Sequence, residues 1–146
     1  MTVQFKTFKA RNKTACLLLF DQNCPEYFAQ NERQDYVSFL NSNPSHYCLC
    51  TNNDKVVGVF GVLKTDDTQS RLEWIMLAPD VQGLGIGTKI MKKSIQLAVQ
   101  QNSTILQIAT SHVAYKFFKK FGAKVILETK NGWGPNMHRI DMELSI

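Results

Sequence analysis

The chain has 146 residues, of which 44% are hydrophobic and 20% charged, and its formal net charge at pH 7 is +5. This composition excludes a disordered chain and is typical of one globular domain, which we expect to span residues 1–146. No apolar run approaches the ~20 residues that cross a bilayer, and the first residues lack the apolar segment of a signal peptide. We therefore expect a cytoplasmic protein with no membrane partner.

The N-terminal half of the chain predicts four strands and two helices. Alternating apolar residues indicate strands, and apolar residues at helical spacing indicate helices. In chain order these elements are a strand at 3–9, helices at 13–21 and from Asn31 onward, and strands at 47–51, 56–64 and 71–77. Asn52–Lys55 reads as a hairpin-like turn between two of the strands.

The C-terminal half predicts two more helices and three more strands. A broad apolar stripe that includes Ile86, Ile90 and Leu97 predicts the first helix. The later elements are a strand at 105–109, a helix at 113–121 that ends at Gly122, and strands at 125–129 and 138–144. A loop with glycine and proline, residues 131–136, links the last two strands.

The cysteines and the positive charge narrow the classes of ligand. The four cysteines are Cys16, Cys24, Cys48 and Cys50, which we expect to be buried free thiols. The histidines show no metal-ligand spacing to them, so we expect no metal. Lysine clusters at 89–93 and 116–120 suit a polyanionic ligand or a solvated helix face. No recognition motif accompanies the charge, so we expect no nucleic-acid partner.

A glycine-rich loop follows the strand at 71–77 and opens the next helix, with Gly83, Gly85 and Gly87 alternating in it. Glycine lets the backbone lie close to a ligand. The N–H groups at a helix start lack intrahelical partners and bind anions, above all phosphates. The loop is therefore a candidate phosphate cradle.

Two common phosphate-binding motifs do not fit this loop. Gly87-Thr88-Lys89 has the wrong order and spacing for a P-loop, and Thr88 and Ile90 stand where a dinucleotide-binding fingerprint requires glycine. The pattern that fits is Gln-x-x-Gly-x-Gly, beginning at Gln82. With the strand before it, this pattern resembles the acyl-CoA pyrophosphate loop of the GNAT superfamily of N-acyltransferases.

The resemblance covers nearly the whole chain, because the predicted order of elements is that of the GNAT fold. It implies an α+β fold (three α/β layers) in which helices cover both faces of a mixed, mostly antiparallel sheet of six to seven strands. It also implies acetyl-CoA as co-substrate, bound between the strands at 71–77 and 105–109. The cofactor contacts that it implies in and before the loop are Leu77, Gln82, Gly83, Leu84, Gly85, Ile86, Gly87 and Thr88.

Residues 111–123 resemble the second cofactor segment of the family. Ala114 and Gly122 match its pattern, and Ser111 stands where asparagine is usual. A serine there can still cap the helix and offer a hydroxyl to the pantetheine arm. The cofactor contacts implied in this segment are Ser111, Ala114 and Phe118.

Phe118 departs from the family pattern, which has a tyrosine here as a frequent general acid for the leaving thiolate. Tyr115 lies three residues earlier on the same helix face and is a candidate replacement. A tyrosine at this spacing among phenylalanines more often serves packing. A thiol pKa near ~8.5 also permits the thiolate to leave without an acid.

Glu73 is the candidate general base. Strand alternation places Arg71, Glu73, Ile75 and Leu77 on one face of the strand at 71–77. An alkyl ammonium (pKa around 10.4) must lose a proton before it attacks, and a carboxylate accepts that proton directly or through a water. The alternative is a surface glutamate paired with Arg71 or a lysine.

Two further roles concern the backbone of Leu77 and the C-terminal loop. The resemblance implies that a bulge near the end of the strand frees the N–H of Leu77 or an immediate neighbour, which donates to the thioester carbonyl and stabilises the oxyanion. Trp133 and His138 are candidates for the acceptor pocket, with His138 an alternative base. Trp133 equally suits a residue that pins the loop to the core.

These features together predict an N-acetyltransferase that moves an acetyl group from acetyl-CoA to a primary amine by direct attack in a ternary complex. The expected acceptor is a small-molecule or peptide amine, and the resemblance also allows a homodimer. A non-catalytic acyl-CoA-binding sensor is the alternative, because Phe118 removes the usual acid.

Overall fold

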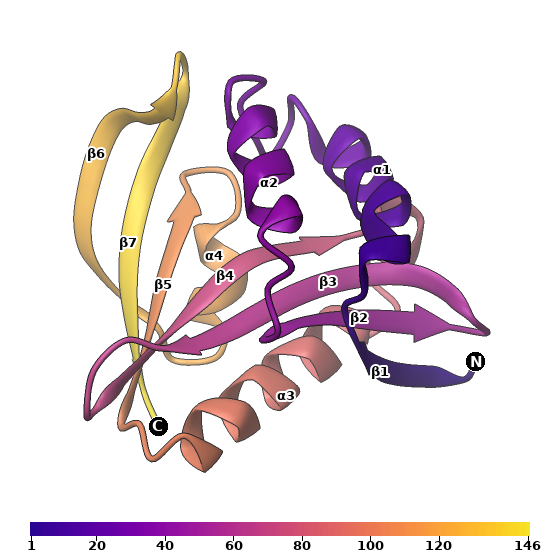
Figure 1. Ribbon diagram of the computed structural model, residues 1–146. Coiled ribbons are helices and arrows are strands. Elements are labelled where there is room, and N and C mark those ends of the chain that lie inside the picture. The colour runs from indigo at the N-terminus through magenta and orange to yellow at the C-terminus, as the bar shows by residue number, and fades with distance from the viewer.

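The computed structural model describes residues 1–146 and contains one seven-stranded sheet with helices on both faces (Figure 1). The strands are β1 (Val3–Thr7), β2 (Tyr47–Asn52), β3 (Lys55–Lys64), β4 (Gln69–Leu77), β5 (Ile105–Ser111), β6 (Lys124–Gly134) and β7 (Met137–Ser145), in the order β1-β2-β3-β4-β5-β7-β6. The helices are α1 (Lys13–Asn23), α2 (Glu32–Asn41), α3 (Ile86–Gln100) and α4 (Tyr115–Lys119), with short 3-10 turns at Ala10–Asn12 and Pro79–Val81. The predicted fold class and order of elements are confirmed.

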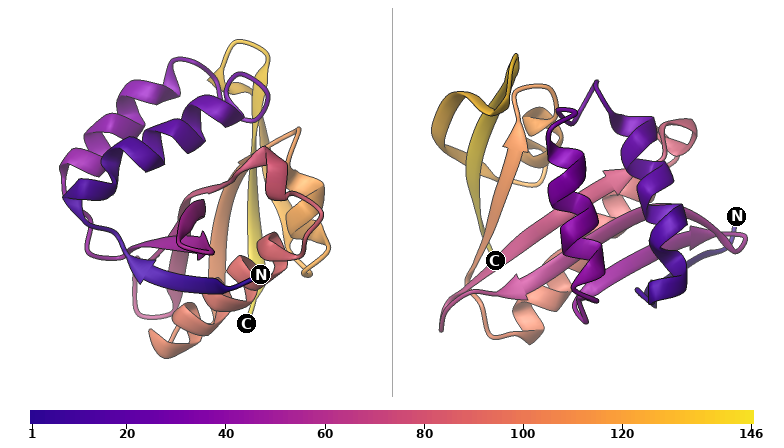
Figure 2. Two further views of the ribbon diagram at one scale, coloured as in Figure 1. Left: turned by 90° about the vertical axis from the view of Figure 1, so that its right-hand side faces the viewer. Right: turned by 45° about the horizontal axis from the view of Figure 1, so that its top comes forward.

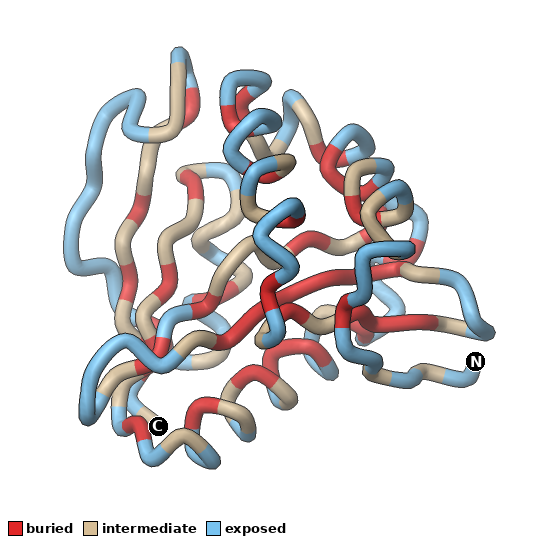
Figure 3. The backbone as a smooth tube through the Cα atoms, in the orientation of Figure 1, coloured by how far each residue is buried: buried red, intermediate tan, exposed pale blue.

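The helices form two outer layers around the sheet. Helices α1 and α2 cover one face, and α3 and α4 cover the other (Figure 2). Burial concentrates in the central strands and on the sheet-facing sides of the helices, while β6 at the edge of the sheet is exposed (Figure 3). None of the helices combines the length and apolar character needed to cross a bilayer.

Strands β4 and β5 form the parallel pair of an otherwise antiparallel sheet. Their pairing ends where Leu72 lies opposite Ile108, although β4 continues to Leu77 and β5 to Ser111. Figure 1 shows the two strands separating beyond this point. The separation leaves their facing backbone edges available to a ligand.

A bulge interrupts β4 and changes which side chains share a face. Trp74 has a φ of 44°, and the register with β3 shifts between Val59 and Gly61. An extra residue in one strand reverses the in–out alternation beyond it. The prediction that Arg71, Glu73, Ile75 and Leu77 share one face is therefore wrong.

The two glycines opposite these side chains show where each one lies. Leu77 pairs with Gly58, whose Cβ position would meet Ile90 of α3, whereas Glu73 pairs with Gly61, whose Cβ position would meet His46 on the other face. Leu77 thus faces the α3 layer, and Glu73 faces the α1–α2 layer.

Two predicted boundaries near the C-terminus also differ from the structure. The helix predicted at 113–121 is shorter, because the residues before Tyr115 form a turn on Ser111. The predicted loop at 131–136 is largely the end of β6, where Gly134 pairs with Met137. Cross-strand bonds such as Asn131 N–H to His138 Nδ1 (2.9 Å) hold this hairpin together, and turn-forming residue types alone do not indicate such bonds.

Candidate active site

A cavity of about 810 Å³ opens where β4 and β5 separate. Its walls come from β4, the glycine-rich loop, β5, the start of α4, the connection between α1 and α2, and the β6–β7 hairpin. The cavity therefore joins segments that are far apart in the sequence. The predicted site residues that line it are Glu73, Leu77, Gln82, Gly83, Gly85, Gly87, Thr88, Ser111, Ala114 and Phe118.

The glycine-rich loop presents bare backbone to this cavity. Gly83 and Gly85 have φ values of 83° and 82°, in the left-handed region that glycine adopts readily, and a Cβ at either would meet no atom within 4 Å. The first backbone bond of α3 after the loop runs from Lys89 N–H to Gly85 O (3.2 Å). The N–H groups of the helix positions between them therefore have no intrahelical acceptor and suit an anion.

Leu84 and Ile86 are not among the residues that line the cavity. The Leu84 side chain is 54% exposed, and Ile86 is fully buried in the core under α3. The N–H of Leu84 donates to Val81 O (3.2 Å), so of these two predicted contacts only Ile86 offers a backbone N–H without an acceptor in the chain.

The end of β4 turns the backbone of Leu77 away from β3. Ala78 N–H donates to Val57 O of β3 (2.8 Å), and consecutive peptide groups of a strand point to opposite edges. The carbonyl of Leu77 instead accepts a bond from Asn23 Nδ2 (3.1 Å), a residue that lines the cavity. The N–H of Leu77 shares this orientation, so it points to the gap between β4 and β5.

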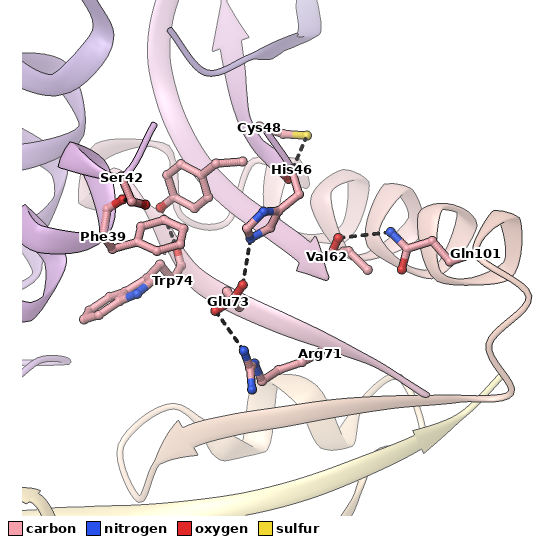
Figure 4. A network of polar contacts seen from close by, with 10 residues as sticks. Phe39, Ser42, His46, Cys48, Val62, Arg71, Glu73, Trp74 and Gln101 are labelled. Carbon is pink, nitrogen blue, oxygen red and sulfur yellow. Dashed lines mark hydrogen bonds and ion pairs between the residues drawn. The ribbon is translucent and has the colours of Figure 1, made fainter. Parts of the chain in front are cut away.

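Glu73 lies within a polar network on the α1–α2 face of the sheet (Figure 4). His46 Nε2 is 2.7 Å from Glu73 Oε1, and an Arg71 guanidinium nitrogen is 3.4 Å from Glu73 Oε2. The Glu73 side chain is 16% exposed, so the carboxylate is neither free on the surface nor sealed in the core. His46 was not predicted, because its approach to Glu73 depends on the register of β2, β3 and β4.

Two buried tyrosines hold the bulge that positions Glu73. Tyr47 Oη donates to the carbonyl oxygen of Trp74 (2.6 Å) and lies 3.0 Å from Tyr36 Oη, which leaves Tyr36 as the donor between them. Burial raises the pKa of Tyr47 well above its usual value, so the phenol stays a donor. The bond stabilises the positive φ of Trp74, a conformation that costs a bulky residue free energy.

A family model described as the acetyltransferase (GNAT) family matches residues 16–123. The match spans the glycine-rich loop, both diverging strands and the turn on Ser111. The chain belongs to the GNAT acetyltransferase family. It is an acyltransferase, and its co-substrate is acetyl-CoA.

Solved acetyltransferases share the fold over their full length. Ard1 from Thermoplasma volcanium has a TM-score of 0.84 and 15% identity, covering 100% of this chain and 99% of its own. The ribosomal-protein-S18-alanine N-acetyltransferase from Escherichia coli has a TM-score of 0.81 and 16% identity, covering 99% and 94%. An aminoglycoside 6'-N-acetyltransferase complexed with coenzyme A has a TM-score of 0.74 and 14% identity, covering 97% and 96%. No curated protein matches the sequence at a significant level.

The segment predicted to be the second cofactor segment of this GNAT acetyltransferase begins as a turn built on Ser111. Ser111 Oγ accepts bonds from the N–H groups of Val113 and Ala114, both at 3.3 Å. Ser111 is 4% exposed and lines the cavity, together with Ala114 and the buried ring of Phe118. Lys120, just after α4, adds a positive charge to the cavity lining.

Tyr115 and His138 lie outside the cavity lining. The Tyr115 ring lies against the side chain of Lys119, whose Nζ is 6.0 Å from the ring centroid. The His138 ring contacts that of His112 at 4.5 Å between centroids, and its Nδ1 accepts the N–H of Asn131. Neither placement supports the role of acid or base that the sequence suggested.

Trp133 and Arg139 bring the β6–β7 hairpin into the cavity wall. Trp133 Nε1 donates to the carbonyl of Thr110 on β5 (2.8 Å), and the Arg139 guanidinium lies 4.6 Å from the indole centroid. Trp133 therefore both pins the hairpin and lines the acetyltransferase cavity.

Glu32 is a cavity residue that the sequence analysis missed. It is the first residue of α2, only 5% exposed, and its Oε2 accepts the N–H of Ala29 (2.8 Å). Burial raises the pKa of this carboxyl to about 7, and the bond from Ala29 offsets only part of that effect. The sequence placed Glu32 at the start of a helix, whereas its burial depends on tertiary packing.

Proposed function

We propose that this acetyltransferase moves the acetyl group of acetyl-CoA to a primary amine by direct attack within a ternary complex. The observation that carries the proposal is the β4 bulge at the gap between β4 and β5. Because of the bulge, the N–H of Leu77 points toward the gap and the Glu73 carboxylate lies on the α1–α2 side of the sheet. Both residues line the same cavity. An oxyanion donor and a proton acceptor thus adjoin the same space.

The glycine-rich loop and the Ser111 turn hold the co-substrate. The N–H groups of Ile86, Gly87 and Thr88, at the positive end of the α3 dipole, bind the pyrophosphate. Lys120 adds a cation to the same cavity, and the Ser111 turn lies along the path of the pantetheine arm.

Leu77 and Glu73 carry the chemical step. Glu73, oriented by His46 and Arg71, accepts a proton from the substrate ammonium directly or through a water. The neutral amine nitrogen then attacks the thioester carbon, and the developing oxyanion accepts a hydrogen bond from the N–H of Leu77, a contribution of a few kcal/mol. As the carbon–sulfur bond breaks, the nitrogen loses its second proton to solvent and becomes the amide. The thiolate leaves without an acid from α4, since Phe118 has no proton to donate, and takes up a proton from water.

The test is release of free coenzyme A from acetyl-CoA in the presence of a pooled panel of primary amines. We expect release that depends on the amine, and we expect Glu73→Gln to lower kcat about 100-fold while the KM for acetyl-CoA stays within about twofold. Glu128→Gln, an exposed carboxylate on β6, serves as the matched control and leaves kcat unchanged. Thermal stabilisation by coenzyme A without release from any amine would contradict the proposal, and an unchanged kcat in Glu73→Gln would remove Glu73 as the base.

A further inference from the structure

The start of α2 places a buried carboxylate without a cationic partner in the wall of the cavity. Glu32 is 5% exposed, yet none of the ion pairs of the protein includes it. Charged residues are seldom buried unless they are paired, because removing a carboxylate from water is costly. Its Oε2 accepts the N–H of Ala29. Its second oxygen receives no bond from the chain and is not among the fully buried polar atoms, so it stays accessible from the cavity that Glu32 lines.

The basic residues of the cavity do not neutralise Glu32. Arg71 is paired with Glu73, and Arg139 is paired with Asp141 at 3.0 Å. The remaining lysine of the lining, Lys120, follows α4 and belongs to the opposite helix layer from α2. Glu32 is therefore a carboxylate for which the protein itself supplies no counter-ion.

Aromatic rings form part of the same cavity wall. Phe28 stacks on Trp74 at 6.2 Å between centroids, and both line the cavity. Asn31, the neighbour of Glu32, donates to the backbone carbonyl of Trp133 (2.8 Å), a residue that also lines the cavity. A cavity that combines a carboxylate without a counter-ion and aromatic faces is a favourable place for an ammonium group.

We propose that Glu32 binds a second ammonium group of the acceptor, so that the substrates of this enzyme are diamines and longer polyamines. This inference rests on the proposed function, which places the reacting nitrogen beside Leu77 and Glu73. Glu32 belongs to another wall, α2 rather than β4, and so it meets a group some distance along the substrate from that nitrogen. A monoamine of similar length leaves the Glu32 carboxylate without a partner.

The competing explanation is that Glu32 only fixes the turn before α2 through its bond to Ala29. Glutamine retains an oxygen that accepts this bond, so Glu32→Gln removes the charge and keeps the turn. Asp35→Asn is the matched control, because Asp35 is an exposed carboxylate one turn further along α2.

The experiment measures equilibrium binding by calorimetry in the presence of coenzyme A, so it does not depend on turnover. The ligands are diamines from 1,3-diaminopropane to 1,6-diaminohexane, each compared with the monoamine of equal carbon number. We expect the wild-type enzyme to prefer the best diamine at least about tenfold, Glu32→Gln to reduce this preference to about twofold or less, and Asp35→Asn to retain it.

Two outcomes would overturn the inference: no diamine preference in the wild type, or an undiminished preference in Glu32→Gln. Binding of coenzyme A by Glu32→Gln with wild-type affinity shows that the variant is folded. Absence of coenzyme A release with every amine would instead contradict the proposed function, and the binding comparison separates the two failures.

Discussion

At the scale of single residues, the cavity holds two carboxylates in different surroundings. Glu73 lies between a histidine and an arginine, while Glu32 has one backbone donor. The difference suits different tasks: a paired carboxylate accepts and returns a proton at a fixed place, and an unpaired one binds a cation.

The burial of Glu32 predicts a specific dependence of stability on pH. Its pKa is about 7 in the folded protein against 4.5 for the exposed group, so the folded state binds the proton more tightly. The contribution of Glu32 to the free energy of unfolding is then greatest below pH 4.5 and decreases as the pH rises through about 7. Glu32→Gln does not titrate. We therefore expect its free energy of unfolding, relative to that of the wild type, to be higher at pH 8 than at pH 5 by on the order of 1–3 kcal/mol.

Urea unfolding of both proteins at the two pH values measures this gain, because titrations elsewhere cancel in the difference. Asp35→Asn removes an exposed carboxylate from the same helix. Its free energy of unfolding relative to wild type changes much less between the two pH values. A difference between Glu32→Gln and wild type that is the same at both pH values would show that Glu32 is not held with a raised pKa.

At the scale of elements, the site depends on two departures from regular structure, the bulge of β4 and the left-handed glycines before α3. The bulge directs Glu73 and Leu77 to different faces, which a regular strand does not allow. The glycines turn the chain into α3 and present backbone without a Cβ to the cavity.

Two substitutions of Gly85 in the glycine-rich loop distinguish the effect of backbone strain from the effect of an added negative charge. Gly85→Glu places a carboxylate beside the pyrophosphate, and we expect coenzyme A affinity to fall more than about 100-fold through repulsion and lost amide contacts. Gly85→Ala adds only the cost of a left-handed Cβ, about 1 kcal/mol of stability, and binds coenzyme A far better than Gly85→Glu. Calorimetric titration of both variants makes the comparison, and equal affinities would contradict the assignment of this loop to the phosphates.

At the scale of the whole molecule, the cavity lies at the seam between two groups of strands. The first four strands join the last three through the parallel pairing of β4 and β5, which stops at Leu72 and Ile108. A ligand seated in the gap contacts both groups. Its binding energy therefore opposes their separation as well as the unfolding of either one.

We accordingly expect coenzyme A to raise the melting temperature. At 100 times its dissociation constant, a ligand that binds only the folded state adds about 2.7 kcal/mol, which corresponds to roughly 5–10 °C for a chain of this size. Scanning calorimetry measures the shift. Pantetheine, which lacks the pyrophosphate, gives a much smaller shift at the same concentration, and equal shifts would argue against the phosphate cradle.

The sequence by itself determined the features that depend on neighbouring residues. The element order and the glycine pattern from Gln82 to Gly87 follow from local periodicity and spacing, and with the resemblance of residues 111–123 they were sufficient to identify the family. The roles of Glu73 and Leu77 stay predictions, although both residues line the cavity.

Only the tertiary structure decided which side chains meet in the cavity. The bulge at Trp74 reversed the alternation that had put Glu73 and Leu77 on one face, and the strand register brought His46 to Glu73. Packing also buried Glu32 and left Tyr115 outside the cavity lining. The physical reason is that a local pattern sets the direction of a side chain relative to its own strand or helix. The groups that this side chain meets depend on register and packing between segments distant in the sequence.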